Sequence, residues 1–79
     1  MNKIDNELLY KYLRDTGLNY SEISREINIS RNTIYNILLG KCSPSPQVIK
    51  IFVNFLKMSR EEFTAVFYPN VEFKEEIKL

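Results

Sequence analysis

The four residues Ile27-Asn28-Ile29-Ser30 constrain the fold more than any other part of the chain. Asparagine is one of the few non-glycine residues that tolerate a positive φ, so Asn28 can end one helix and redirect the chain. Ser30 is a good N-cap, because its hydroxyl can accept a hydrogen bond from the free backbone N–H groups of the following turn. The pattern predicts two helices joined by a tight turn, with the second helix beginning at Ser30 or Arg31.

The second of these helices has a clear end and two distinct faces. Gly40 supplies a stop, and the prolines at 44 and 46 cannot extend the same helix. We therefore expect about three turns. Ile34, Ile37 and Leu38 have the spacing of a buried stripe. The outer face and first turn then carry four side chains of the types that hydrogen-bond or pack against base edges: Arg31, Asn32, Tyr35 and Asn36.

Cap residues and apolar spacing predict three more helices in addition to the two that the turn joins. They predict no strand before residue 70. A first helix starts at Asp5 or Asn6 and ends near Thr16, and Gly17 closes it. The other starts are Asn19 with Glu22, Ser45 with Pro46, and Ser59 with Glu62. The fold class expected is all-α, with residues 1–68 forming one domain and 69–79 a tail. The expected core includes Leu9, Tyr12, Leu13, Ile23, Ile27, Ile34, Ile37, Leu38, Ile49, Phe52, Val53, Leu56, Phe63, Val66 and Phe67.

Composition excludes several function classes. A chain of 79 residues has room for one core, and its single cysteine, Cys42, cannot form an internal disulfide. No apolar run approaches the roughly 20 residues of a membrane span, and no secretory signal is visible, so we expect a soluble cytoplasmic protein. The chain has no histidine and one cysteine, so it lacks the side chains that a zinc site or a Cys/His nucleophile requires. No cofactor is expected. Glu22 and Glu26 lie one turn apart but have no accompanying nucleophile, so an enzyme is not expected.

The net charge of +1 hides an uneven distribution. Residues 1–26 carry a net −1 and residues 61–79 a net −3, whereas residues 27–60 carry five basic groups and no acidic one. The basic groups are Arg31, Lys41, Lys50, Lys57 and Arg60. Because the acid-free segment contains the helix that follows the turn, a side that faces phosphates is credible. For Lys57 and Arg60 a solvated surface is the favoured interpretation.

These residues together resemble the lambda-repressor-like helix-turn-helix family of Cro and CI type, also called XRE, over about Leu8 to Phe63. The matching pieces keep the family's order and spacing. They are Leu18, Glu22-Ile23-Ser24, Ile27-Asn28-Ile29-Ser30, Thr33-Ile34, Ile37, Gly40-Lys41 and Pro44-Ser45. The resemblance implies a five-helix domain that binds a double-stranded DNA operator as a homodimer, with the third helix in the major groove. A transcriptional regulator of a phage or mobile element, acting as a repressor, is the function expected.

The resemblance also distributes roles among the residues. Base readout falls to Arg31, Asn32, Tyr35 and Asn36. Contacts to the DNA backbone fall to Tyr20, Ser30, Thr33, Lys41 and Ser43. The chain departs from the family pattern at two positions near the DNA backbone. The family usually has glutamine at the position of Tyr20 and a polar residue at that of Leu39. A tyrosine hydroxyl can still donate to a phosphate, whereas a leucine cannot.

An alternative function remains open, in which the domain binds a partner repressor protein instead of an operator. The near-neutral charge and the two departures lower phosphate affinity while offering side chains that protein interfaces favour. The patch would consist of Tyr20, Arg31, Tyr35, Asn36 and Leu39. The tail fits helical and strand spacing equally, and with the fifth helix it can supply a dimer surface, because Phe73, Ile77 and Leu79 would otherwise be exposed.

Overall fold

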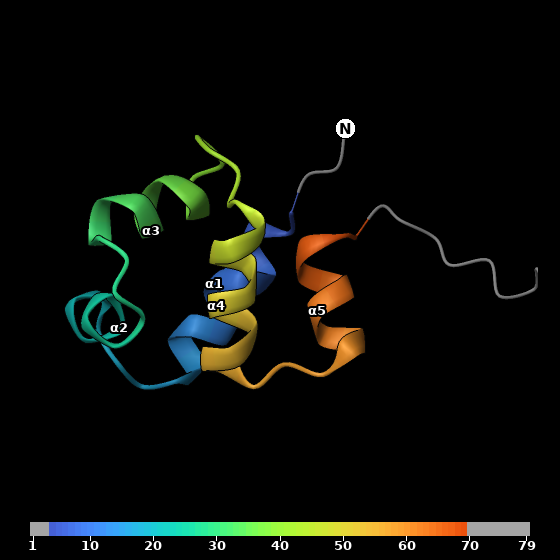
Figure 1. Cartoon of the computed structure of the whole chain (residues 1–79), viewed down its shortest axis with the longest axis horizontal. Helices are drawn as coiled ribbons and strands as arrows, with labels where there is room; N and C mark the ends of the chain where they lie inside the picture. The colour runs from blue at the N-terminus through green and yellow to red at the C-terminus, as the bar shows by residue number, and fades with distance from the viewer. Residues whose placement is uncertain (1–3, 70–79) are drawn as a thin grey trace, which may run out of the picture.

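A computed structural model of the chain describes residues 4–69, which form five α-helices and contain no strand (Figure 1). The all-α class expected from the sequence is confirmed. The interpretation of residues 70–79 as a helix or a strand lies outside the described residues. The helices are α1 (Asn6–Asp15), α2 (Tyr20–Ile27), α3 (Arg31–Leu38), α4 (Pro46–Leu56) and α5 (Arg60–Phe67).

Each helix begins at a side chain that caps it. Asp5, Ser30 and Ser45 each accept a hydrogen bond from the backbone N–H three residues ahead. Asn19 and Ser59 form reciprocal capping boxes, in which the glutamate three residues on accepts from the N–H of the cap. All five predicted starts are therefore confirmed, with Asp5 rather than Asn6 as the first cap.

The helices enclose one apolar core that contains no buried polar residue among residues 4–69. Every helix contributes to it, so no helix is a peripheral addition. Of the fifteen core residues named from the sequence, six are only half-buried, namely Tyr12, Leu38, Ile49, Val53, Leu56 and Phe63. The fully enclosed members are Leu9, Leu13, Ile23, Ile27, Ile34, Ile37, Phe52, Val66 and Phe67.

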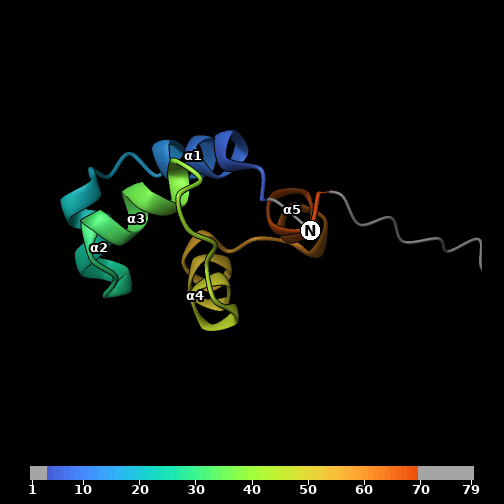
Figure 2. The same cartoon turned by 90° about the horizontal axis from the view of Figure 1, so that it is seen from above.

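The helices are arranged so that α2 and α5 lie at opposite ends of the described part, with α1 and α4 between them (Figures 1 and 2). The helix α3 packs against both α1 and α2. At the far end, the N–H of Asp5 donates to the carbonyl of Val66 at 2.7 Å, which ties the start of α1 to α5. The helix α1 therefore contacts both α3 and α5.

The length of α3 differs from the expectation. The helix α3 contains eight residues, or about two turns, instead of about three, because Leu39 and Gly40 already belong to its cap. Within residues 4–69, no helix has both the length and the apolar character that spanning a membrane requires.

Candidate nucleic-acid interface

The turn between α2 and α3 is closed by two hydrogen bonds that join Ser24 and Ile29. Asn28 has φ 59° and ψ 40°, the left-handed conformation predicted for it. The N–H of Ile29 donates to the carbonyl of Ser24 at 3.3 Å, and the hydroxyl of Ser24 donates to the carbonyl of Ile29 at 2.6 Å. Because both backbone groups of Ile29 are bound to the same residue of α2, the direction in which α3 leaves the turn is fixed.

The first turn of α3 presents Arg31 and Asn32 to solvent. Ser30 is used within the turn itself, since its hydroxyl accepts from the N–H of Thr33 at 3.1 Å and donates to the hydroxyl of Thr33 at 2.9 Å. The proton of the Thr33 hydroxyl is left free to donate elsewhere. The hydroxyls of Ser30 and Thr33 are both predicted to contact the DNA backbone, and that of Thr33 is therefore the better placed of this pair.

Arg31 is held by a residue that the sequence analysis did not single out. Its guanidinium donates to the hydroxyl of Ser21, in the first turn of α2, at 3.1 Å. A guanidinium has five N–H donors, so this bond orients the group and leaves most of its donors available. The sequence offers one signal for this pair. Ser21 and Arg31 each lie in the first helical turn of one of the two helices that Asn28 joins.

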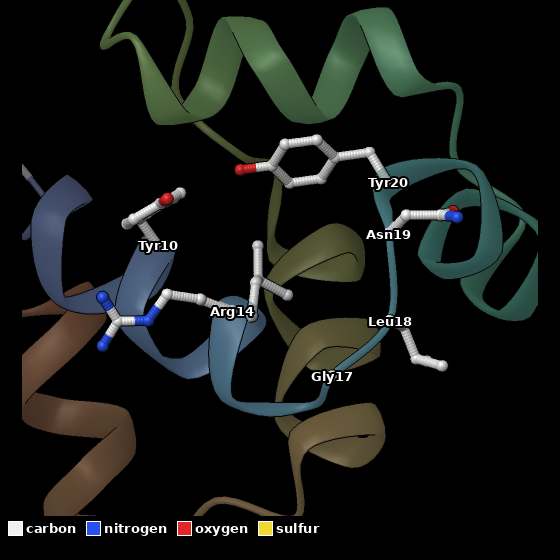
Figure 3. Close-up of a pocket in the computed structure, with 7 residues that line it drawn as sticks. Tyr10, Arg14, Gly17, Leu18, Asn19 and Tyr20 are labelled. Carbon is white, nitrogen blue, oxygen red and sulfur yellow. The ribbon is translucent and has the colours of Figure 1, made fainter.

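Tyr20 and Tyr35 form an aromatic pair between α2 and α3. Their ring centroids lie 5.0 Å apart and their planes are inclined by 86°, an edge-to-face contact. Tyr20 is half-buried and its hydroxyl points toward the Tyr10 side of α1 (Figure 3). Burial raises the pKa of Tyr20 above its usual value, and the neighbouring Tyr10 and Tyr35 phenols raise it further. Tyr20 therefore packs against Tyr35 of α3 on the side that faces α1 (Figure 3). Its phenol remains a neutral hydrogen-bond donor at physiological pH.

Two adjoining cavities lie beside this pair, and we call five of the aromatic and leucine side chains that line them the tyrosine face. A cavity of about 420 Å³ lies between α1 and α2 and is lined by Tyr10, Arg14, Leu18 and Tyr20 among others (Figure 3). The Arg14 guanidinium lies 5.9 Å from the centre of the Tyr10 ring, a cation–π contact. An adjoining cavity of about 380 Å³ shares two of these residues and extends to α3. The tyrosine face comprises Tyr10, Leu18, Tyr20, Tyr35 and Leu39, of which Leu39 is 66% exposed.

The far end of α3 is closed by Gly40, whose φ is 77°. The N–H of Lys41 donates to the carbonyl of Asn36 at 2.8 Å and that of Gly40 to the carbonyl of Ile37 at 3.1 Å, the two bonds of a Schellman motif. This cap places Lys41 and Ser43 in an exposed loop directly after α3. Asn36 is half-buried, whereas Arg31 and Asn32 are exposed, so the four residues predicted to read bases are not equally accessible.

Four of the five basic residues of the acid-free segment divide between two regions, and the fifth, Lys57, is the C-cap of α4. Arg31 and Lys41 lie at the two ends of α3. Lys50 and Arg60 instead line a groove between α4 and α5, and α5 lies at the opposite end of the described part from α2 (Figure 1). The sequence segment therefore does not form a single basic face, and only two of its five basic groups accompany the predicted reading helix.

The arrangement matches a known family. A family model described as Helix-turn-helix matches residues 9–63. The chain belongs to the lambda-repressor-like helix-turn-helix family. The match starts within α1 and ends within α5, so it includes the turn and parts of all five helices. No curated protein and no solved structure matches the chain significantly.

Membership gives the function class. A lambda-repressor-like helix-turn-helix domain is a DNA-binding regulator, and the family is not typically enzymatic. Within this class α3 corresponds to the helix that follows the turn, and its exposed first turn is the part that reaches base edges in such domains.

Proposed function

We propose that the chain is a sequence-specific transcriptional repressor of a phage or mobile element that occupies a short DNA operator in the cytoplasm. The observation that carries the proposal is the first turn of α3, where Arg31 and Asn32 are exposed with no acidic residue in the helix. Arginine can bind guanine O6 and N7 with two hydrogen bonds, and asparagine can bind adenine N6 and N7 in the same way. Tyr35 and Asn36 complete the reading surface.

The DNA backbone contacts we propose lie on either side of α3. Lys41 and Ser43 are exposed in the loop at its end, and Thr33 has a free hydroxyl proton near its start. Ser30 contributes by capping α3, and Tyr20 contributes by packing against Tyr35 of α3. Contacts to phosphate hold the domain in register without carrying sequence information.

A homodimer is part of the proposal, because one such domain covers too few base pairs to be highly selective. Two copies would bind half-sites one helical turn apart. We propose residues 1–68 as the DNA-binding domain, and α5 together with tail residues 69–79 as the dimer surface. Sedimentation of the chain lacking residues 70–79 tests this surface: a monomer is expected, and a dimer would show that the surface lies elsewhere.

The DNA-binding proposal is tested by titrating the purified chain against DNA from its own genetic neighbourhood, with a scrambled duplex of equal length as the control. Affinity for one site should exceed that for the scrambled duplex and should fall steeply between about 50 and 200 mM salt, because phosphate contacts release counterions. Weak binding without preference at both salt concentrations would refute an operator-reading repressor.

The tyrosine face favours a second candidate function, in which the domain modulates a partner repressor protein. Tyr35 and Leu39 are exposed beside α3, and contiguous exposed apolar side chains mark protein interfaces more often than phosphate contacts. The contact patch would comprise Tyr20, Arg31, Tyr35, Asn36 and Leu39. If this function holds, Leu39→Lys will abolish capture of the partner repressor without lowering DNA affinity. If the parent chain captures no repressor, or if Leu39→Lys captures it as well as the parent chain does, the second candidate is wrong.

A further inference from the structure

The helices α4 and α5 leave an open apolar groove between them that neither the DNA-binding surface nor the tyrosine face includes. Its volume is about 460 Å³. Five half-buried apolar side chains form its walls, which explains why residues of α4 predicted as core are incompletely covered within residues 4–69. These wall residues are Ile49, Val53, Met58, Phe63 and Tyr68.

The rim of the groove is basic. Lys50 of α4 and Arg60 of α5 both line it and both are exposed. Among residues 4–69, no acidic residue lines it. An apolar floor with a cationic rim fits a segment that combines apolar side chains with a net negative charge.

Such a segment follows directly in the chain. Tyr68 lines the groove, and the described chain ends one residue later, at Pro69. The next ten residues carry more acidic than basic groups and four apolar side chains, Val71, Phe73, Ile77 and Leu79. We propose that residues 70–79 fold back and occupy the α4–α5 groove of their own chain, so that the docked tail and α5 together form the outer surface proposed above for the dimer.

Length and connection both support this occupant. Ten residues span about 15 Å as a helix and about 33 Å when extended, whereas the eight residues of α5 span about 12 Å. Proline followed by asparagine suits the two central positions of a β-turn, so Pro69 and Asn70 can reverse the chain at the mouth of the groove. A short connection gives an effective concentration in the millimolar range, which favours the chain's own tail over that of a second copy.

The test uses the full chain carrying Phe73→Trp. Since the chain contains no tryptophan, the introduced indole is the sole reporter of its kind. We expect emission at shorter wavelength than that of a free indole and several-fold slower quenching by acrylamide, both independent of protein concentration. Adding Arg60→Glu, an exposed change that leaves the core intact, should move emission to longer wavelength and restore quenching.

Lys41→Glu is the matched control, because it makes the same charge reversal in the exposed loop after α3. It should leave the emission unchanged. An indole that is solvated at every concentration overturns the proposal, as does an equal effect of the two reversals. If the indole is buried only at concentrations at which sedimentation detects dimers, the groove binds the tail of a second copy. That result would also overturn the proposal. No readout involves DNA, so the outcome is independent of operator binding.

Discussion

The hydrogen bond from the Ser24 hydroxyl to the Ile29 carbonyl is the contact whose removal best tests how the turn is held. The two oxygens lie 2.6 Å apart and the bond is partly buried. Ser24→Ala removes the donor and leaves the carbonyl of Ile29 without it, while the N–H of Ile29 keeps its bond to the Ser24 backbone. The change is small in volume, so the loss of the hydrogen bond dominates.

The expected loss of stability follows from the cost of leaving a partly buried carbonyl unpaired. That cost is about 1–3 kcal/mol for a buried group, and partial access of water here places Ser24→Ala at about 1–2 kcal/mol. For a domain of this size each kcal/mol lowers Tm by about 4–8 °C. Thermal and urea unfolding followed by circular dichroism measure it, and the urea midpoint should fall with no change in slope.

Ser21→Ala is the matched control, because it removes the same hydroxyl three residues earlier in α2. Ser21 is exposed, and its bond to Arg31 joins two solvated side chains, so the loss should stay within about 0.5 kcal/mol. Equal stability losses for Ser24→Ala and Ser21→Ala would refute the reasoning, since they would show that the Ser24 bond does not hold the turn.

Three further predictions concern backbone strain, titration and phosphate contact. Gly40→Ala should lower the free energy of unfolding by about 1–2 kcal/mol because of the positive φ at this position. The loss should exceed that of Gly17→Ala, because only at Gly40 does the added Cβ lie 3.1 Å from a side-chain nitrogen of α1. Equal unfolding free energies of the two variants would contradict this. The raised pKa of Tyr20 favours the neutral phenol in the folded chain, so its stabilisation holds below the ordinary value of about 10 and is lost as pH rises through the higher folded value. Unfolding free energies measured across this range should decline more steeply in the parent than in Tyr20→Phe, and parallel curves would be the contrary result. Lys41→Ala should weaken binding to all duplexes alike and lower the salt slope by about one, whereas Lys50→Ala should leave both unchanged; a filter-binding titration with the same slope for both variants would exclude a phosphate contact at Lys41.

The fold was predictable because its signals are local. A cap residue acts on backbone groups two or three residues away, and the spacing of Ile34 and Ile37 follows from the helical period alone. The positive φ of Asn28 follows equally from its side-chain chemistry between two apolar neighbours. These features needed no knowledge of how the helices cross.

The side-chain couplings were not predictable for the opposite reason. The bond between Ser21 and Arg31 and the contact between Tyr20 and Tyr35 depend on the angle between α2 and α3, which no local pattern specifies. The inclusion of Tyr10 in the tyrosine face depends likewise on the packing of α1 against α3. Residue types therefore indicated which side chains suit DNA, whereas their neighbours and accessibility required the tertiary structure.

The central claim, that α3 reads an operator, is tested most directly by the ratio of affinities for the selected site and a scrambled duplex. Arg31→Ala should lower this ratio by about 5–150-fold, the discrimination expected of one two-bond contact to guanine. Arg25→Ala removes the same charge from an exposed position of α2 and should leave the ratio unchanged. A ratio that falls only in Arg31→Ala supports base readout by α3, and a ratio that is the same in both variants contradicts it.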